Sequence, residues 1–143
     1  MKFSDLEHEL QNDFPKIELG VDLAQESLKI PALFSKWMQF YNAEKLILNK
    51  YRAEAKKLYK RLMEYYSGQA SPEVYHEKPL NIKILKGEID KYIELDSEMI
   101  QMKERIENQE TKVKFLEETI KAIRDRNFII KNAIEYSKFI SGL

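Results

Sequence analysis

The sequence predicts an all-α protein in which a long N-terminal helix packs with a C-terminal helical region. Glycine and proline are scarce, with 4 of each among 143 residues. Apolar residues recur every three or four positions, which is the period of a helix and not of a strand. Charged residues make up 34% of the chain and balance to a net charge of zero. Such dense, balanced charge is typical of long solvent-exposed helices.

Two short helices are expected in the first 30 residues, roughly Asp5 to Asp13 and Val21 to Lys29. A turn near Pro15 and Gly20 would separate them, because both residue types interrupt regular structure. Pro31 then suits the first turn of a further helix, where its missing N–H costs nothing.

From Pro31 to Tyr66 no glycine or further proline interrupts the chain. This predicts one helix about 50 Å long, at ~1.5 Å per residue. Its apolar face consists of Trp37, Phe40, Ile47, Leu48, Tyr51, Ala55, Leu58, Tyr59, Leu62, Tyr65 and Tyr66. Gly68 suits the left-handed position that ends a helix.

Residues 69–79 are expected to form a connector, because they contain two prolines. A second helical region would begin near Leu80 and carry an imperfect heptad stripe, which favours bundle packing over a free coiled coil. Asn127 is the best candidate for a break, since asparagine tolerates left-handed geometry. A last helix, about 128–141, would follow it. The chain would thus divide into an N-terminal region, 1–76, with a basic helix at about 31–67, and a C-terminal region, 77–143.

Composition excludes several classes of protein. No cysteine is present, which rules out disulfides, thiolate metal sites and a cysteine nucleophile. The N-terminus lacks the apolar run of a signal peptide, and no stretch approaches the ~20 apolar residues of a membrane span. A cytoplasmic protein without a membrane partner is therefore expected.

Positive charge is concentrated in one segment. Residues 36–61 carry 8 basic and 2 acidic side chains, whereas residues 62–110 carry 6 basic and 11 acidic ones. The basic side chains expected on the helix surface are Lys45, Lys50, Arg52, Lys56, Lys57, Lys60 and Arg61. Such a strip can neutralise phosphates, and neighbouring Tyr65 and Tyr66 could stack on bases. Tyr51 and Tyr59 are expected in the core. The alternative interpretation is a solvated helix face whose tyrosines all belong to the core.

Signs of catalysis are weak. Asp90 and Glu94 are four residues apart on a predicted helix and could hold Mg²⁺ in a nuclease, but nothing is spaced to complete a two-metal site. His8 and His76 lack ligand spacing, and no phosphate-binding loop motif is present. We therefore expect a protein that is not an enzyme, without cofactor or metal.

Four segments carry more specific information: SLKIPALFSKW (residues 27–37), LYKRLMEYYSG (58–68), LNIKILKGEIDKYIE (80–94) and RNFIIKNAIEYSKFISG (126–142). They resemble the UvsY recombination mediator family of T4-like phages, its cyanophage members especially. The resemblance follows the chain in order over nearly its whole length. None of these strings is a catalytic motif.

The resemblance implies a phage-encoded protein of the host cytoplasm that forms ring-shaped homo-oligomers, of six or seven subunits in this family. Such proteins bind single-stranded DNA and contact a RecA-like phage recombinase of the UvsX type and the phage single-strand-binding protein. They promote loading of the recombinase in homologous recombination and repair. The matching DNA-binding candidates are Lys60 and Arg61, with Lys56 and Lys57 as neighbours. Oligomerisation is carried over to Phe128, Ile130, Ile134 and Phe139. The competing hypothesis is a non-enzymatic helical scaffold whose basic strip pairs with acidic surfaces of neighbouring subunits.

Overall fold

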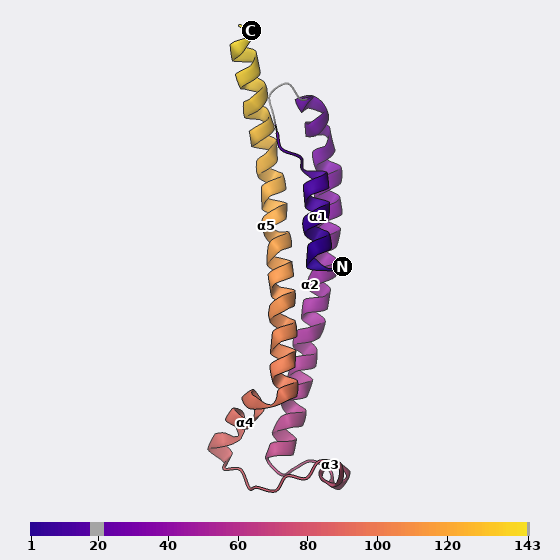
Figure 1. Cartoon of the computed structure of the whole chain (residues 1–143), viewed down its shortest axis with the longest axis vertical. Helices are drawn as coiled ribbons and strands as arrows, with labels where there is room; N and C mark the ends of the chain where they lie inside the picture. The colour runs from indigo at the N-terminus through magenta and orange to yellow at the C-terminus, as the bar shows by residue number, and fades with distance from the viewer. Residues whose placement is uncertain (18–21, 143) are drawn as a thin grey trace. The chain divides into compact units, whose positions relative to one another are not determined.

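The computed structural model of the chain describes residues 1–17 and 22–142, and every regular element in these residues is helical. In order, the elements are α1 (Phe3–Asp13), α2 (Leu23–Tyr66), α3 (Pro72–Glu77), the 3-10 helix η1 (Lys86–Glu88), α4 (Ile89–Leu95) and α5 (Ser97–Ile140) (Figure 1). The predicted all-α class is confirmed. The two longest elements, α2 and α5, each contain 44 residues.

The first helix agrees with the prediction, since α1 ends at Asp13 as expected. The predicted turn at Gly20 and the predicted helix start at Val21 lie outside the described residues.

The predicted helix boundary at Pro31 is wrong, because α2 runs through this residue. Leu23 and Ile30, which precede the proline, are buried in the same core as Trp37, which follows it. Packing on both sides therefore keeps the backbone helical, although proline removes one backbone hydrogen bond and disfavours the helical conformation of the residue before it. Pro31 itself is exposed.

Two predicted boundaries in the C-terminal half are also wrong. Residues 78–85 are not helical, so the second helical region begins at η1 and not at Leu80. At Asn127, α5 continues without interruption. Ile123 and Ile130, on either side of Asn127, are both buried in one core and keep the same helix face in place. The real break is at Asp96, whose side-chain Oδ1 accepts a hydrogen bond from the Glu98 backbone N–H at 2.9 Å and so caps α5.

The end of α2 follows the prediction. Gly68 has a φ of +81°, in the left-handed region. The Gln69 N–H donates to the Glu64 carbonyl at 2.9 Å and the Gly68 N–H to the Tyr65 carbonyl at 3.2 Å. This is the Schellman arrangement, which satisfies carbonyls that the helix end would leave without partners. The connector that follows contains the short helix α3.

Two compact units make up the chain: the terminal unit, Met1–Glu44 with Lys112–Leu143, and the central unit, Lys45–Thr111. Each unit contains part of α2 and part of α5. The units therefore cut across the halves 1–76 and 77–143 that the connector suggests.

The terminal unit has an apolar core to which α1, α2 and α5 all contribute (Figure 1). Its buried residues are Leu6, Leu23, Ile30, Trp37, Leu116, Ile120, Ile123 and Ile130. Polar contacts fix α1 beside α2: the Trp37 indole N–H and the Lys36 ammonium both donate to the Asp13 carboxylate, at 3.0 and 2.7 Å. Hydrogen bonds to Asp13 and Glu9 raise the pKa of Lys36 above its usual value.

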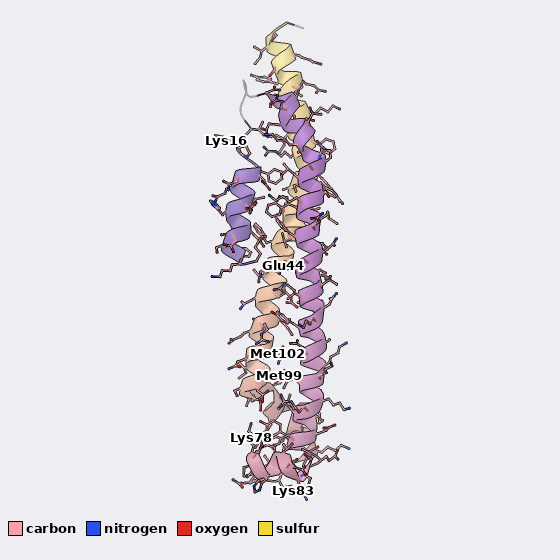
Figure 2. All side chains as sticks on the ribbon, turned by 90° about the vertical axis from the view of Figure 1, so that its right-hand side faces the viewer. Lys16, Glu44, Lys78, Lys83, Met99 and Met102 are labelled. Carbon is pink, nitrogen blue, oxygen red and sulfur yellow. The ribbon has the colours of Figure 1, made fainter. Side chains whose placement is uncertain are left out.

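The central unit has a smaller core formed by Leu58, Leu62, Ile89, Ile93 and Met99. Met99 and Met102 lie on the side of α5 that faces α2 (Figure 2). The flexible methionine side chains fill the space between helices of this core.

Candidate nucleic-acid interface

Seven predicted cationic residues lie on one part of α2 in the central unit. Six of them are exposed: Lys50, Arg52, Lys56, Lys57, Lys60 and Arg61. Lys45 is half-buried. Leu58 and Leu62, which fall on the opposite face, are buried in the core. Because the buried face fixes how α2 is rotated, the cations are held towards solvent at helical spacing. We call this set the cationic strip.

The two arginines of the strip are paired with carboxylates of α5. The Arg52 guanidinium lies 3.1 Å from a Glu110 oxygen, and that of Arg61 lies 2.5 Å from a Glu98 oxygen. All four side chains are about half exposed, between 46% and 61%. Exposed pairs of this kind are worth only roughly 0.2–1 kcal/mol. A phosphate could therefore replace either carboxylate at small cost.

The lysines of the strip are differently placed. Within the described residues, no carboxylate lies within 4 Å of the ammonium groups of Lys50, Lys56, Lys57 or Lys60. Exposed charges of this kind are screened by the ions of the solvent. Release of such ions by a bound polyanion is the main driving force of backbone-dominated nucleic-acid binding.

The tyrosines do not have the exposure expected from the sequence. Tyr65 is buried at 7% exposure, and its ring stacks on Tyr75 with centroids 5.4 Å apart. The Tyr66 hydroxyl donates to the buried Asp96 carboxylate at 2.6 Å. Desolvation and this hydrogen bond raise the pKa of Tyr66 well above its usual value. Both rings belong to the packing of the central unit and are not exposed stacking surfaces in this structure.

Tyr59 is more exposed than the sequence predicts. The apolar period predicts it in the core, but its side chain is 43% exposed. Its hydroxyl donates to Asp90 at 2.7 Å, and this hydrogen bond raises the pKa of Tyr59. Tyr51, also expected in the core, is half-buried, and the Arg105 guanidinium lies 5.5 Å from its ring centroid. Tyr59 is therefore the strip's exposed aromatic neighbour.

A second exposed surface lies on the C-terminal part of α5, in the terminal unit. Of the four predicted oligomerisation residues, Phe128 and Phe139 are 68% and 80% exposed. Ile130 is buried at 2%, and Ile134 packs against the same core. The last two thus stabilise the terminal unit itself. Three further exposed apolar residues, missed from the sequence, are Ile129, Tyr136 and Ile140.

The five exposed residues share one side of α5. At ~100° per residue they occupy about a third of the circumference, opposite Ile130 and Ile134. We call them the apolar face of α5. A helical wheel of residues 128–140 contains this signal, because it has two apolar stripes where a monomeric surface helix needs one. Large exposed apolar patches on proteins are typical of interaction sites, so these five residues are the candidate interaction surface of α5.

The described residues contain no group of three or more histidine, cysteine, aspartate or glutamate side chains suited to a metal ion. Asp90, proposed as part of a nuclease pair with Glu94, accepts the hydrogen bond from Tyr59. Within the same residues, none of the helices has the length and apolar character to cross a bilayer.

The fold can be compared with those of solved structures. The chain is similar to crystal structures of the bacteriophage T4 recombination mediator protein UvsY. For lattice type II the TM-score is 0.84 at 23% identity, over 99% of this chain and 98% of that one. For lattice type I the TM-score is 0.81 at 23% identity, over 94% and 98%. At these identities the likeness establishes a common fold.

No curated protein matches the sequence. A family model described as "Recombination, repair and ssDNA binding protein UvsY" matches residues 9–143. Because this match spans almost all of the sequence, the chain belongs to the UvsY family.

Proposed function

We propose that the chain is a recombination mediator that binds single-stranded DNA along the cationic strip. In this role it promotes loading of a RecA-like phage recombinase onto strand coated by a single-strand-binding protein. The observation that supports the proposal most is the set of exposed lysines on α2, Lys50, Lys56, Lys57 and Lys60, without carboxylate partners in the described residues. Membership of a family described as binding single-stranded DNA points the same way.

The strip suits a backbone-dominated mode of binding. Its cations project from a continuous helix, so the backbone that carries them is already ordered before the strand arrives and no folding cost is added on binding. If about five phosphates are neutralised per subunit, the logarithm of the affinity should fall with that of salt concentration with a slope of roughly −3.5. Such contacts do not distinguish base sequence.

Self-association supplies the affinity that one strip lacks. We propose that the apolar face of α5 joins subunits into a ring-shaped homo-oligomer, of six or seven subunits if this chain follows the family. Several strips then bind one strand, and each contact after the first is intramolecular. A strand bent along such a ring would release its coat protein and be offered to the recombinase. Nothing in this role requires catalysis by the chain.

The competing function is a scaffold in which the strip only pairs subunits. The Arg52–Glu110 and Arg61–Glu98 ion pairs show that the strip's arginines and the acidic residues of α5 can be complementary. The scaffold function gives no role to the lysines that have no carboxylate partner. We therefore favour the function in which the strip binds DNA.

The test is fluorescence anisotropy of a labelled, unstructured single-stranded oligonucleotide, titrated at two salt concentrations with duplex as competitor. We expect tight binding that weakens steeply with salt and prefers single strands. Absence of binding at low salt would contradict the proposal. A following assay would measure recombinase ATPase activity on coated strand, which the protein should restore.

A further inference from the structure

A hollow of about 580 Å³ opens in the central unit where the cationic strip ends. Its apolar walls include Met63 of α2, Ile84 and Leu85 of the segment before η1, and Ile89 of α4. Two exposed cations, Lys83 and Lys86, line it as well. We call it the connector hollow. Its volume lies within the range of about 300–1,000 Å³ that is usual for sites of small organic groups.

The connector hollow continues one row of the strip. Lys56, Lys60, Met63 and Ser67 follow one another at intervals of four, three and four residues, so they share a face of α2. Met63 and Ser67 both line the hollow. A strand bound to Lys56 and Lys60 would therefore reach the hollow about one helical turn later, at ~5.4 Å per turn.

The hollow offers both an apolar surface and cations, which are the two features that a bound nucleotide requires. An unpaired base has apolar faces that pack on apolar side chains, and its phosphates need cations. Leu85 is 68% exposed and lines the hollow together with Lys83 and Lys86, so an apolar side chain and two cations are accessible at the same place. Asp90 is the one carboxylate among the lining residues, and it accepts the hydrogen bond from Tyr59.

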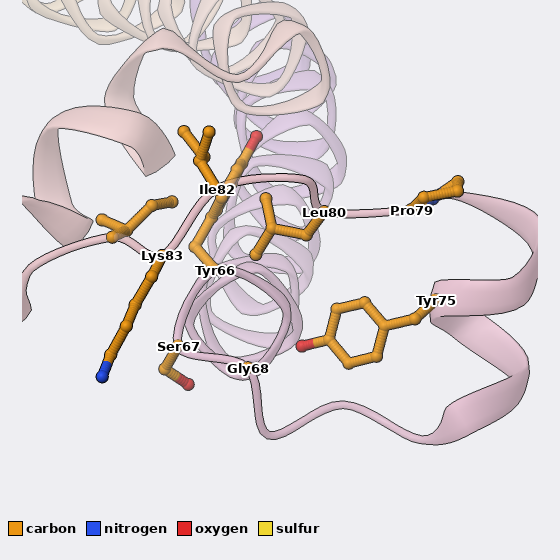
Figure 3. Close-up of a pocket in the computed structure, with 9 residues that line it drawn as sticks. Tyr66, Ser67, Gly68, Tyr75, Pro79, Leu80, Ile82 and Lys83 are labelled. Atoms are coloured by element: carbon orange, nitrogen blue, oxygen red, sulfur yellow. The ribbon is translucent and has the colours of Figure 1, made fainter.

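Lys83 stands between this hollow and a second one of about 520 Å³. Both are lined by Ser67, Lys83 and Ile84. In Figure 3, which shows the second hollow, the Lys83 side chain extends on the side of Ser67, and Tyr75 lies on the other side of the α2 end. Lys83 thus lies on the same side of the α2 end as Ser67, which belongs to the row that includes Lys60.

We infer that the connector hollow is a second DNA subsite, which takes a base of the bound strand while Lys83 and Lys86 contact the adjoining phosphates. This inference rests on the proposed function. An acidic peptide with an apolar side chain would also suit the hollow taken alone. The alignment with Lys56 and Lys60 favours a strand, because one polyanion then satisfies the row and the hollow together.

The test compares full-length variants in their affinity for two oligonucleotides of equal length, oligothymidine and an abasic strand. Lys83→Ala/Lys86→Ala should weaken binding of both several-fold and make the salt slope shallower by about 1.4, or 0.7 per lost phosphate contact. Leu85→Ser should weaken binding of oligothymidine about threefold and leave the abasic strand unchanged, because it removes apolar contact with the base only. The matched control is Lys91→Ala/Lys103→Ala, which removes two exposed lysines of the same unit that do not line the hollow.

Unchanged affinity and salt slope in Lys83→Ala/Lys86→Ala, with wild-type protein binding normally, would overturn the inference and leave the proposed function standing. The inference would also be overturned if a labelled acidic peptide bound the wild type but not Lys83→Ala/Lys86→Ala, while both proteins bound the DNA strands equally well. Failure of the wild type to bind either strand would instead overturn the proposed function. Circular dichroism of each variant confirms that the fold is kept.

Discussion

The terminal and central units are built from parts of the same two long helices, yet their exposed surfaces differ. In the terminal unit, α5 buries Ile130 and exposes Phe128 and Phe139. In the central unit, α2 buries Leu58 and Leu62 and exposes lysines. One surface suits association with apolar partners and the other suits a polyanion. On the proposed function, self-association and DNA binding would use separate surfaces, so substitutions should remove them one at a time.

The largest effect on folding is expected at the buried side of α5. Ile130→Ala should lower the free energy of unfolding by about 2–5 kcal/mol, because it leaves a cavity in the core of the terminal unit. Urea unfolding followed by circular dichroism measures this loss. An unchanged midpoint would mean that Ile130 serves an interface and not the core.

Substitutions on the exposed side of α5 should reduce self-association and leave folding stability unchanged. Phe128→Ser/Phe139→Ser should leave helicity intact but give monomers or small oligomers, and affinity for a long strand should fall about 100-fold through lost avidity. Sedimentation velocity and anisotropy measure the two effects. A variant that keeps its full mass would show that the apolar face does not join subunits. Deleting residues 128–143 is a poorer test, since Ile130 is lost too.

A smaller loss is expected at the buried hydrogen bond of the central unit. Tyr66→Phe removes the donor to Asp96 and should cost about 1–3 kcal/mol of stability, because a buried carboxylate loses a partner. The pKa of Tyr66 is raised from 10.0. The contribution of the Tyr66–Asp96 hydrogen bond to folding stability is therefore fully present below pH 10. It is lost as the pH rises through the raised pKa of the folded state. Urea unfolding at pH 7 and pH 11 should show a smaller difference in stability between variant and wild type at pH 11, because Tyr66 ionises in the unfolded wild-type chain above pH 10.

The smallest effect concerns the arginines of the strip. Glu98→Gln/Glu110→Gln frees Arg61 and Arg52 from exposed pairs worth roughly 0.2–1 kcal/mol each. Affinity for single-stranded DNA should rise roughly two- to fivefold per pair at low salt. Glu104→Gln/Glu107→Gln, which removes two exposed carboxylates from the same helix, is the control for net charge. Equal gains in both variants would indicate a general charge effect and not competition for the arginines.

Much of the fold could be predicted from local sequence. The helix end at Gly68 depends on one residue's conformational freedom, and the rotation of α2 follows from the apolar period that includes Leu58 and Leu62. The continuity of α2 through Pro31 could not be predicted, because it depends on core contacts made with residues more than 80 positions away. The continuity of α5 through Asn127 could not be predicted either, because it depends on the burial of Ile123 and Ile130 in the same core.

The candidate site was predictable to a similar extent. The cations of the strip are exposed because they fall opposite a clear apolar stripe. The orientations of Tyr65 and Tyr66 depend on Tyr75 and Asp96, which come from other elements. The double apolar pattern of residues 128–140 was in the sequence, but only the structure separates its buried side from its exposed side.

The most direct test of the account is charge reversal in the strip, Lys56→Glu/Lys60→Glu, with mass and DNA binding measured on the same preparation. We predict oligomers of unchanged mass by sedimentation and loss of anisotropy change with labelled single-stranded DNA. Disassembly of the oligomer with DNA binding retained would contradict the account and identify the strip as a packing surface between subunits.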